Sequence, residues 1–255
     1  MNEVLERRSA AIGARVKVER ARGAPRIDVG VDRRGEFFAL RVSRDAEAVS
    51  VVDADRDDRS LLLLVRDGGE KSKFLCGFDE RHWFVAAIPE SASGVGGVAA
   101  AKDALQPDAV RHAVARVRPR DRFRRRNVAY VRQGEWFFLP QWAVEVDDGA
   151  VLRDEPLTRG LGKSHVLEYA FRRSGETVFV NAVHPTGISV AEFELLPPSQ
   201  VRAGGWREMV RDPELYAKGA VRHPDHNTIV LHGWHRVLTN TEHAARARRH
   251  VAFID

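Results

Sequence analysis

Short apolar runs alternate with charged turns over the first 90 residues. A charged stretch with helix-compatible spacing, residues 1–22, ends at Gly23-Ala-Pro25, and apolar runs then recur about every eight to twelve residues. This spacing, with Asp, Arg and Gly at the breaks, is typical of an antiparallel sheet or barrel. The pattern predicts about six short strands, at residues 26–31, 36–42, 48–52, 60–66, 73–76 and 82–88.

The run SLLLLVR at residues 60–66 differs from its neighbours because apolar residues occupy consecutive positions. Successive side chains of a strand point to opposite faces, so such a run predicts that both faces are covered. We therefore expect this strand at the centre of its sheet.

The pattern changes at SASGVGG (91–97), where we place a domain boundary. AAAKDAL and DAVRHAVARV then have helical spacing. Pro107 separates them, because proline has no amide hydrogen and restricts the residue before it. The sequence therefore predicts two short helices in this part of the chain.

Beyond these helices the pattern again predicts strands, at 134–140, at 142–146, near 176–183 and at 228–238. A mostly helical insertion is expected from SVAEFELLPPSQ through GGWREMVRDPELYAKG. A final short helix is expected at 241–249, with Asn240 as its N-cap. The segment SHVLEYAF (164–171) fits either a strand or two helical turns.

These elements predict an α+β, β-rich fold. Its expected parts are an N-terminal antiparallel sheet module with a leading helix (1–90), a helical, arginine-rich connector (91–127), and a C-terminal small β-barrel-like module with a helical insertion (128–255).

The composition places the chain among ordinary globular proteins, with 44% hydrophobic and 30% charged residues. The first residues, MNEVLERRSA, lack the apolar run of a secretory signal, and no segment approaches the roughly 18 apolar residues of a membrane span. The single cysteine, Cys76, excludes an internal disulfide and fits a reducing compartment. We therefore expect a cytoplasmic protein with no membrane partner.

Positive charge is concentrated in residues 111–132. Nine arginines face one acid there, Asp121, giving a local charge near +8 against +5 for the whole chain. Arginine suits bidentate contacts with phosphate, and nothing in the stretch reads a base. Our first hypothesis is a non-enzymatic protein that binds nucleic acid, RNA or DNA, with RNA or a ribonucleoprotein favoured. The expected binding residues are Arg116, Arg118, Arg120, Arg122, Arg124, Arg125, Arg126, Tyr130 and Arg132.

The alternative for this stretch is structural. It would then be a solvated linker, or it would pair with the acidic runs at 53–58 and 145–155.

Four of the ten histidines lie in VRHPDHNTIVLHGWHRV (221–237). Pro224 suits the second position of a type I turn, whose first and fourth Cα atoms lie within about 7 Å, so His223 and His226 can converge. Strand alternation separates His232 from His235 unless a bulge forms at the glycine between them, Gly233. The second hypothesis is a site for a metal, with zinc as the expected ion. Its ligands would be His223, His226, His235 and, from a neighbouring strand, His165, with His184 as a further option.

Such a metal could activate water, with Asp225 as the nearest carboxylate to serve as base. The protein would then be a metal-binding β-barrel or a metal-dependent hydrolase. The alternative is that His235 is a hydrogen-bonded core residue and that His223 and His226 are exposed turn residues. A scaffold that binds another protein is the third hypothesis.

Two further motifs give weaker evidence for a function. Cys76 lies near His82, but Asp79 and Glu80 would raise the pKa of its thiol, and its place in an apolar run predicts burial rather than nucleophilic catalysis. RGLGKSH (159–165) ends like a phosphate-binding loop, but the first glycine of that motif is missing. We therefore expect a glycine turn and not an ATPase.

Three segments resemble a set of bacterial proteins: FLCGFDERHWFVAA (74–87), RRNVAYVRQGEWFFLP (125–140) and VRHPDHNTIVLHGWHRVLTNTE (221–242). The second half also resembles a broader group with a Gln-Gly-Asp strand opening, a Gly-His-x-His turn and a closing His-x-x-His strand. In this chain the corresponding segments are RQGEWFFLP, GKSHV and RHPDHNTIVL. Glu135 therefore occupies the position of the aspartate, and Lys163 occupies that of the first histidine in the Gly-His-x-His turn. The resemblance implies a shared β fold and no particular activity, and the change to Lys163 weakens any inherited metal site.

Overall fold

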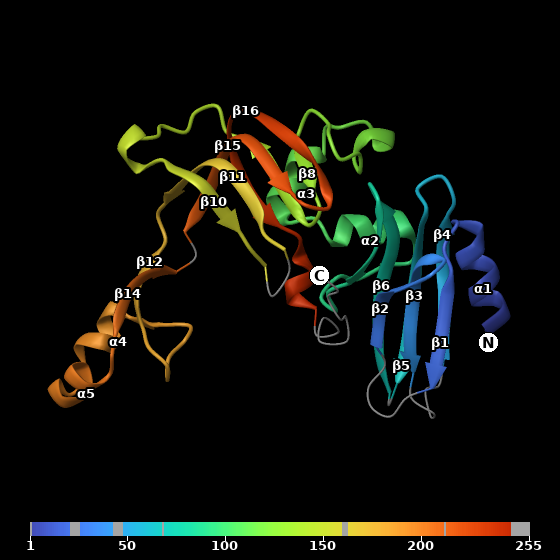
Figure 1. The fold of residues 1–255 in the computed structure, drawn as a ribbon, viewed down its shortest axis with the longest axis horizontal. Coiled ribbons are helices and arrows are strands. Elements are labelled where there is room, and N and C mark those ends of the chain that lie inside the picture. Colours follow the sequence, from blue (N-terminus) through green and yellow to red (C-terminus); the bar gives the residue numbers. More distant parts are fainter. Residues whose placement is uncertain are drawn as a thin grey trace.

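Strands dominate the computed structural model, which describes residues 2–20, 26–42, 48–67, 69–159, 163–211 and 213–245. They form four sheets, and the helices are few and short, so the α+β, β-rich fold is confirmed. Figure 1 shows two main bodies, one built from the first seven strands and one around a six-stranded sheet, with a slender arm extending from the second.

The N-terminal body contains two sheets. One has the order β1-β3-β2 and the other the order β4-β5-β6-β7. Their strands are β1 (Val16–Arg20), β2 (Arg26–Asp32), β3 (Gly35–Val42), β4 (Ala48–Asp55), β5 (Ser60–Asp67), β6 (Glu70–Asp79) and β7 (His82–Ala87). All six predicted strands are present, and β5 is an inner strand of its sheet.

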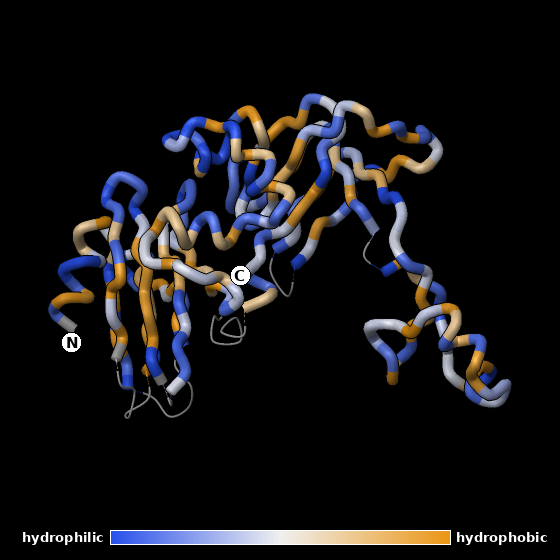
Figure 2. Tube along the Cα trace, turned by 180° about the vertical axis from the view of Figure 1, so that it is seen from behind, coloured by the Kyte–Doolittle hydropathy of each residue, from blue (hydrophilic) through white to orange (hydrophobic). Residues whose placement is uncertain are grey.

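Both faces of β5 are covered, as its run of leucines predicts. Leu61 and Leu63 belong to the core shared with the first sheet, whereas Leu62 packs with residues of the first connector helix on the other side. Apolar residues follow the strands of this body in Figure 2.

The helix expected at residues 1–22 is shorter than predicted. Helix α1 spans Asn2–Ala11, and Gly13, with φ +82°, follows its end. Residues Val16–Arg20 instead form β1, parallel to β3, because Val16 and Val18 alternate with polar residues and pack against the core. The Gly23-Ala-Pro25 stretch lies outside the described residues.

The connector contains both predicted helices, α2 (Val98–Ala104) and α3 (Asp108–Val114), with Pro107 as the N-cap of α3. A 3-10 turn, η1 (Pro119–Asp121), follows. The buried side of α3 packs through Val110 and Val114 against Phe137 and Leu139 of the next sheet.

The C-terminal body is a six-stranded antiparallel sheet in the order β10-β11-β15-β16-β9-β8. It is open, with β10 and β8 at its edges. Its strands are β8 (Val131–Gln133), β9 (Trp136–Pro140), β10 (Leu152–Leu157), β11 (His165–Arg173), β15 (Glu214–His223) and β16 (His226–Thr239). The ambiguous segment 164–171 is therefore a strand.

The strand predicted at 142–146 is wrong, because these residues lie in a loop and β10 follows instead. The apolar side chain that suggested a strand, Trp142, is 78% exposed and lies against Gly233 rather than in a core.

The expected helical insertion is only partly helical. It is the arm of Figure 1, in which β12 (Glu176–Val180) pairs with β13 (Ile188–Ser189) and β14 (Arg207–Arg211). Its helices are α4 (Val190–Glu194) and α5 (Pro198–Ala203). The end of the segment was predicted to be helical but forms β14 and β15. These residues are strands because β14 pairs with β12 and β15 pairs with β11.

The end of the described chain returns to the N-terminal body. Asn240 caps the 3-10 helix η3 (Thr241–Ala244), as predicted, and residues 246–255 lie outside the described part. Glu242 accepts a hydrogen bond from the backbone of Ala87 at 3.1 Å, and the backbone N–H of Thr241 donates to Leu105 at 3.1 Å. These contacts tie the two bodies together.

Candidate functional site

The turn between β15 and β16 brings two histidines together. His223 pairs with His226 across Pro224-Asp225, and their ring centroids are 4.7 Å apart. The backbone N–H of Asp225 donates to Nδ1 of His223 at 3.1 Å, which fixes the orientation of that ring. The predicted convergence at this turn is confirmed.

His165, the first residue of β11, completes the group. Only 2% of it is exposed, and its ring centroid lies 4.2 Å from that of His223 and 5.8 Å from that of His226. One ligand atom from each histidine lies within 4.8 Å of the others. Three of the four predicted ligands therefore meet at one place.

Gly134, between β8 and β9, leaves room in front of these rings. A Cβ atom at this position would lie 3.2 Å from Nε2 of His226 and 3.7 Å from Nε2 of His165. The backbone φ of +57° also favours glycine. Both Nε2 atoms therefore face the same small space above a residue without a side chain.

Four buried polar atoms around this space lack a hydrogen-bond partner among the described residues: His165 Nε2, His226 Nδ1, Gln133 Oε1 and Trp136 Nε1. Most buried polar atoms in proteins have such a partner. Their concentration on β8, β9 and the histidine group indicates a place where a further group is bound.

Burial keeps these imidazoles neutral. It lowers the pKa of His165 to about 3, with a further contribution from His223 and His226. Burial also lowers the pKa of His226, and His223 adds to this effect. Neutral imidazole is the form that binds metals, so the site is ready to bind a cation at pH 7 without losing protons from these two rings.

The N-terminal body supplies carboxylates behind the histidines. Glu80, between β6 and β7, accepts a hydrogen bond from the backbone of Asn227 at 2.8 Å and lies 3.6 Å from Nδ1 of His226. Its φ of +54° is unusual for a residue with a side chain, and such strain is common at functional sites. A carboxylate behind a histidine is the usual outer-shell partner in metal sites.

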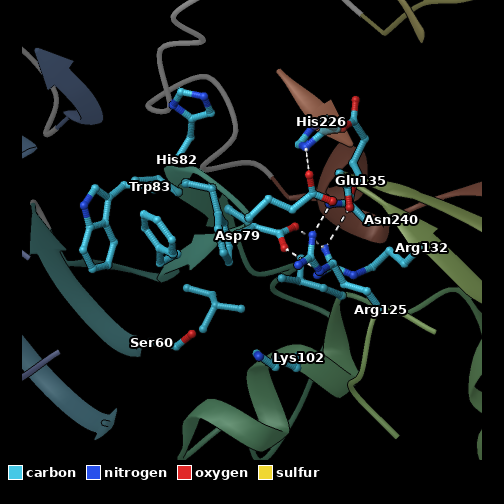
Figure 3. A pocket seen from close by; sticks show the side chains of 18 of the residues that line it. Ser60, Asp79, His82, Trp83, Lys102, Arg125, Arg132, Glu135, His226 and Asn240 are labelled. Carbon is cyan, nitrogen blue, oxygen red and sulfur yellow. Dashed lines mark hydrogen bonds and ion pairs between the residues drawn. The ribbon is translucent and has the colours of Figure 1, made fainter. Parts of the chain in front are cut away.

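Two arginines hold these carboxylates. Arg125 forms ion pairs with Asp79 and Glu80, and Arg132 pairs with Asp79 at 3.0 Å. Figure 3 shows Asp79 facing both guanidinium groups, with His226 on the other side of the network. Glu80 is therefore held in place beside His226.

The histidine group opens into a cavity of about 830 Å³ between the two bodies. Its lining includes Trp83 and Lys102 from the first half of the chain and Glu135 and Asp225 from the second. The volume is in the range of small-molecule sites.

His235, predicted as a fourth ligand, does not belong to this group. The bulge that the sequence left open at Gly233 is present, since the register shifts between Ala217 and Gly219 and the glycine has φ +87°. However, Nδ1 of His235 donates to the carbonyl of Gly233 at 2.9 Å, and its ring lies edge-on to Trp142. The alternative, a hydrogen-bonded core histidine, is correct for this residue.

The two other histidines considered lie elsewhere. His232 is exposed on β16. His184 stacks on Trp206 in the arm, with ring centroids 5.5 Å apart.

Much of the arginine-rich stretch stabilises the structure itself. Arg122 donates to the carbonyl of Val117 at 3.0 Å, Arg124 pairs with Asp121 at 3.1 Å, and Arg126 donates to the carbonyl of Val230 at 3.4 Å. With Arg125, Arg132 and Arg120, which pairs with Asp121 at 3.8 Å, six of the arginines predicted to contact nucleic acid make internal bonds. The acidic partners are Asp79, Glu80 and Asp121, not the runs expected at 53–58 and 145–155.

Tyr130 was predicted to contact nucleic acid, and this is wrong. Only 1% of it is exposed, and its hydroxyl donates to the carbonyl of Arg122 at 2.7 Å, so the ring cannot stack on a base. Arg116, Arg118 and Arg120 are exposed.

The sequence analysis missed Glu80 and Gly134 as parts of the site. Glu80 attracted notice only as a neighbour of Cys76, whose thiol is fully buried and whose pKa is raised by that burial. Gly134 was placed only at the start of the strand predicted at 134–140, and only the folded arrangement shows which side chains face it.

The chain matches no protein-family model, no curated protein and no solved structure. Among the described residues, no helix is long and apolar enough to cross a membrane. The argument for function therefore rests on the geometry of the site.

Proposed function

We propose that the protein binds a divalent transition-metal ion through His165, His223 and His226, and that zinc is the ion expected. The observation that supports this proposal is the convergence of three imidazoles, with a ligand atom from each within 4.8 Å of the others. Nitrogen ligands of this kind suit zinc, which holds them at about 2.0–2.1 Å. The rings must therefore draw somewhat closer together around the ion.

Metal binding would change the hydrogen bonds of His223 more than those of the other two ligands. Nδ1 of His223 accepts a hydrogen bond from the backbone N–H of Asp225, so Nε2 carries the ring proton and donates to the carbonyl of Lys163 at 3.2 Å. A ring nitrogen that binds a metal carries no proton, so coordination through Nε2 would move the ring proton to Nδ1. This change would end both the contact with Lys163 and the hydrogen bond from Asp225.

Three protein ligands leave a coordination position open, as in catalytic zinc sites. The open position would face the cavity, where a bound ion lowers the pKa of water enough to supply hydroxide near neutral pH. Glu135 and Asp225 are among the carboxylates that line the same cavity, and we propose that one of them receives the proton. A metal-dependent hydrolase is therefore the activity that we propose.

Metal content and affinity test the proposal. The chain would be purified without a metal-affinity column, stripped with a chelator and titrated with Zn²⁺ by calorimetry. We expect one ion per chain and a higher melting temperature in the loaded protein. Absence of binding in the wild type, or binding that survives replacement of all three histidines by alanine, would overturn it.

A cytoplasmic location is part of the same proposal. Its support is the single cysteine, Cys76, which is free and buried and needs no oxidising compartment.

A further inference from the structure

The six-stranded sheet has a second face that the histidine site does not use. Side chains directly opposite each other on paired strands lie on the same face. Tyr169 is paired with Arg153 on one side and with Lys218 on the other, and Tyr216 is paired with Phe171 and Arg236. Because residues two apart share a face, these side chains form one surface. We call it the outer face: Arg153, Tyr169, Phe171, Arg173, Tyr216, Lys218, Trp234 and Arg236.

The inner face carries the core and the histidine group. Ala170 is paired with Ala217, and Ala217 with His235, and all three are buried. His165 is two residues from Leu167, which packs in the same core. The outer face is therefore separated from the proposed metal site by the thickness of the sheet.

Cations lie over aromatic rings across the outer face. The Arg153 guanidinium is 5.2 Å from the centre of the Tyr169 ring, Lys218 Nζ is 5.9 Å from that of Trp234, and Arg173 is 5.7 Å from that of Tyr216. Trp234 also contacts Phe171 edge-on, with centroids 6.3 Å apart. Tyr169 and Trp234 are half-buried, so each has an accessible edge or face.

Positive charge on this face is only partly balanced. Glu214 pairs with Arg173 and Arg236, at 3.4 and 3.1 Å. Among the described residues no ion pair joins Arg153 or Lys218 to a carboxylate, and both are exposed. These two cations, next to accessible rings, are available to an anionic partner.

Helix α3 covers one end of this surface. Leu139 is paired with Arg236, so the β9 end of the outer face is the part that α3 covers. The stretch that follows α3 reaches β16, where Arg126 donates to the carbonyl of Val230.

We propose that the outer face binds single-stranded nucleic acid. Bases would stack on Tyr169 and Trp234, while Arg153 and Lys218 contact phosphates. Stacking platforms beside a cationic track are the general means of binding single strands with little sequence preference. The site is independent of the proposed metal ion. The aromatic residues that would contact bases are those of the sheet, not the buried Tyr130.

Fluorescence anisotropy with the full chain and a labelled 20-nucleotide oligo-uridine tests the proposal. We expect binding at about 50 mM salt that weakens steeply as salt rises. Tyr169→Leu and Trp234→Leu should each weaken binding about tenfold or more, since each removes a stacking ring. Trp234→Phe should restore most of the affinity. Trp142→Leu, a change of an exposed tryptophan that contacts His235 instead, should leave it unchanged.

Charge variants complete the test. Arg153→Gln with Lys218→Gln should weaken binding and reduce the salt slope, whereas Arg202→Gln with Arg207→Gln in the arm should change neither. The proposal is overturned if the wild type does not bind, if the leucine variants bind like wild type while melting normally, or if a duplex binds as tightly as the single strand. A labelled oligo-thymidine of the same length distinguishes RNA from DNA as the bound strand, and equal binding supports a site that reads stacking and phosphate alone.

Discussion

The β15–β16 hairpin carries a pair of histidines at its turn and another pair at its bulge, and only the first pair forms a site. His223 and His226 face His165 on β11, with ring centroids 4.2 and 5.8 Å from it. At the bulge, His232 is exposed and His235 is buried against Trp142. The two pairs have the same chemistry and nearly the same spacing in the sequence.

The difference lies in what each pair faces. The pair at the turn faces a third histidine, a glycine without a side chain and a held carboxylate. At the bulge, Nδ1 of His235 already has a partner, the carbonyl of Gly233. The proposed metal site therefore depends on the convergence of histidines from separate strands, rather than on the number of histidines nearby in the sequence.

The largest expected effect is the loss of His165. Replacing His165 by alanine removes one of three ligands, so we expect Zn²⁺ affinity to fall by more than the roughly 10–100-fold typical of outer-shell changes. His232→Ala, from the other pair, should leave the affinity unchanged. Calorimetric titration of both variants measures this, and equal losses in both would break the distinction between the two pairs.

The next effect concerns the carboxylate behind His226. Glu80→Gln keeps the shape of the side chain but removes the charge beside Nδ1, so affinity for Zn²⁺ should fall about 10–100-fold. Glu36→Gln is the matched control, because Glu36 also accepts bonds near β7, from Trp83 and His82, but not from the histidine group. An unchanged affinity in Glu80→Gln, measured by competition with a chelating dye, would remove Glu80 from the site.

A smaller effect is expected at Gly134. Gly134→Ala places a methyl group 3.2 Å from Nε2 of His226 and should weaken Zn²⁺ binding several-fold. The alanine also costs about 1–2 kcal/mol in a left-handed conformation. Gly205→Ala is the control for this backbone cost, because Gly205 has φ +58° and no atom of the described chain lies near its Cβ position. Denaturant titration should show similar destabilisation in both variants, with weaker metal binding in Gly134→Ala alone.

The smallest expected effect is on the pH dependence of stability without metal. The pKa of His165 is lowered to about 3, so between this value and the ordinary value near 6.5 the unfolded chain binds the extra proton. Stability should therefore be full above pH 6.5 and fall as pH decreases through this window, by up to about 1.4 kcal/mol per pH unit from this group. His165→Gln should have a shallower slope between pH 6.5 and 4.5, and His232→Gln the slope of the wild type.

The local pattern predicted much of this structure. Strands β2 to β7 of the N-terminal body, the two connector helices and the turn at Pro224 all follow from spacing and turn chemistry. These features depend on residues that are neighbours in the sequence.

Features that depend on distant contacts could not be predicted in this way. Glu80 reaches the histidines only because β6 and β7 pack beside the hairpin, with Arg81 donating to Asn227 at 2.8 Å. Tyr130 lies among arginines in the sequence, yet it is buried against Phe137. The alternation of apolar and polar residues at 142–146 is typical of a strand. However, this segment pairs with no described strand, and Trp142 lies against Gly233.

Zinc K-edge X-ray absorption of the full chain, loaded with one equivalent of Zn²⁺, tests the central claim most directly. We expect a first shell with three imidazole nitrogens at about 2.0–2.1 Å and one exchangeable oxygen ligand. The His165→Ala protein should lose one imidazole from that shell, and the His232→Ala protein none. A wild-type shell without three imidazoles, or one that His165→Ala leaves unchanged, would contradict the account.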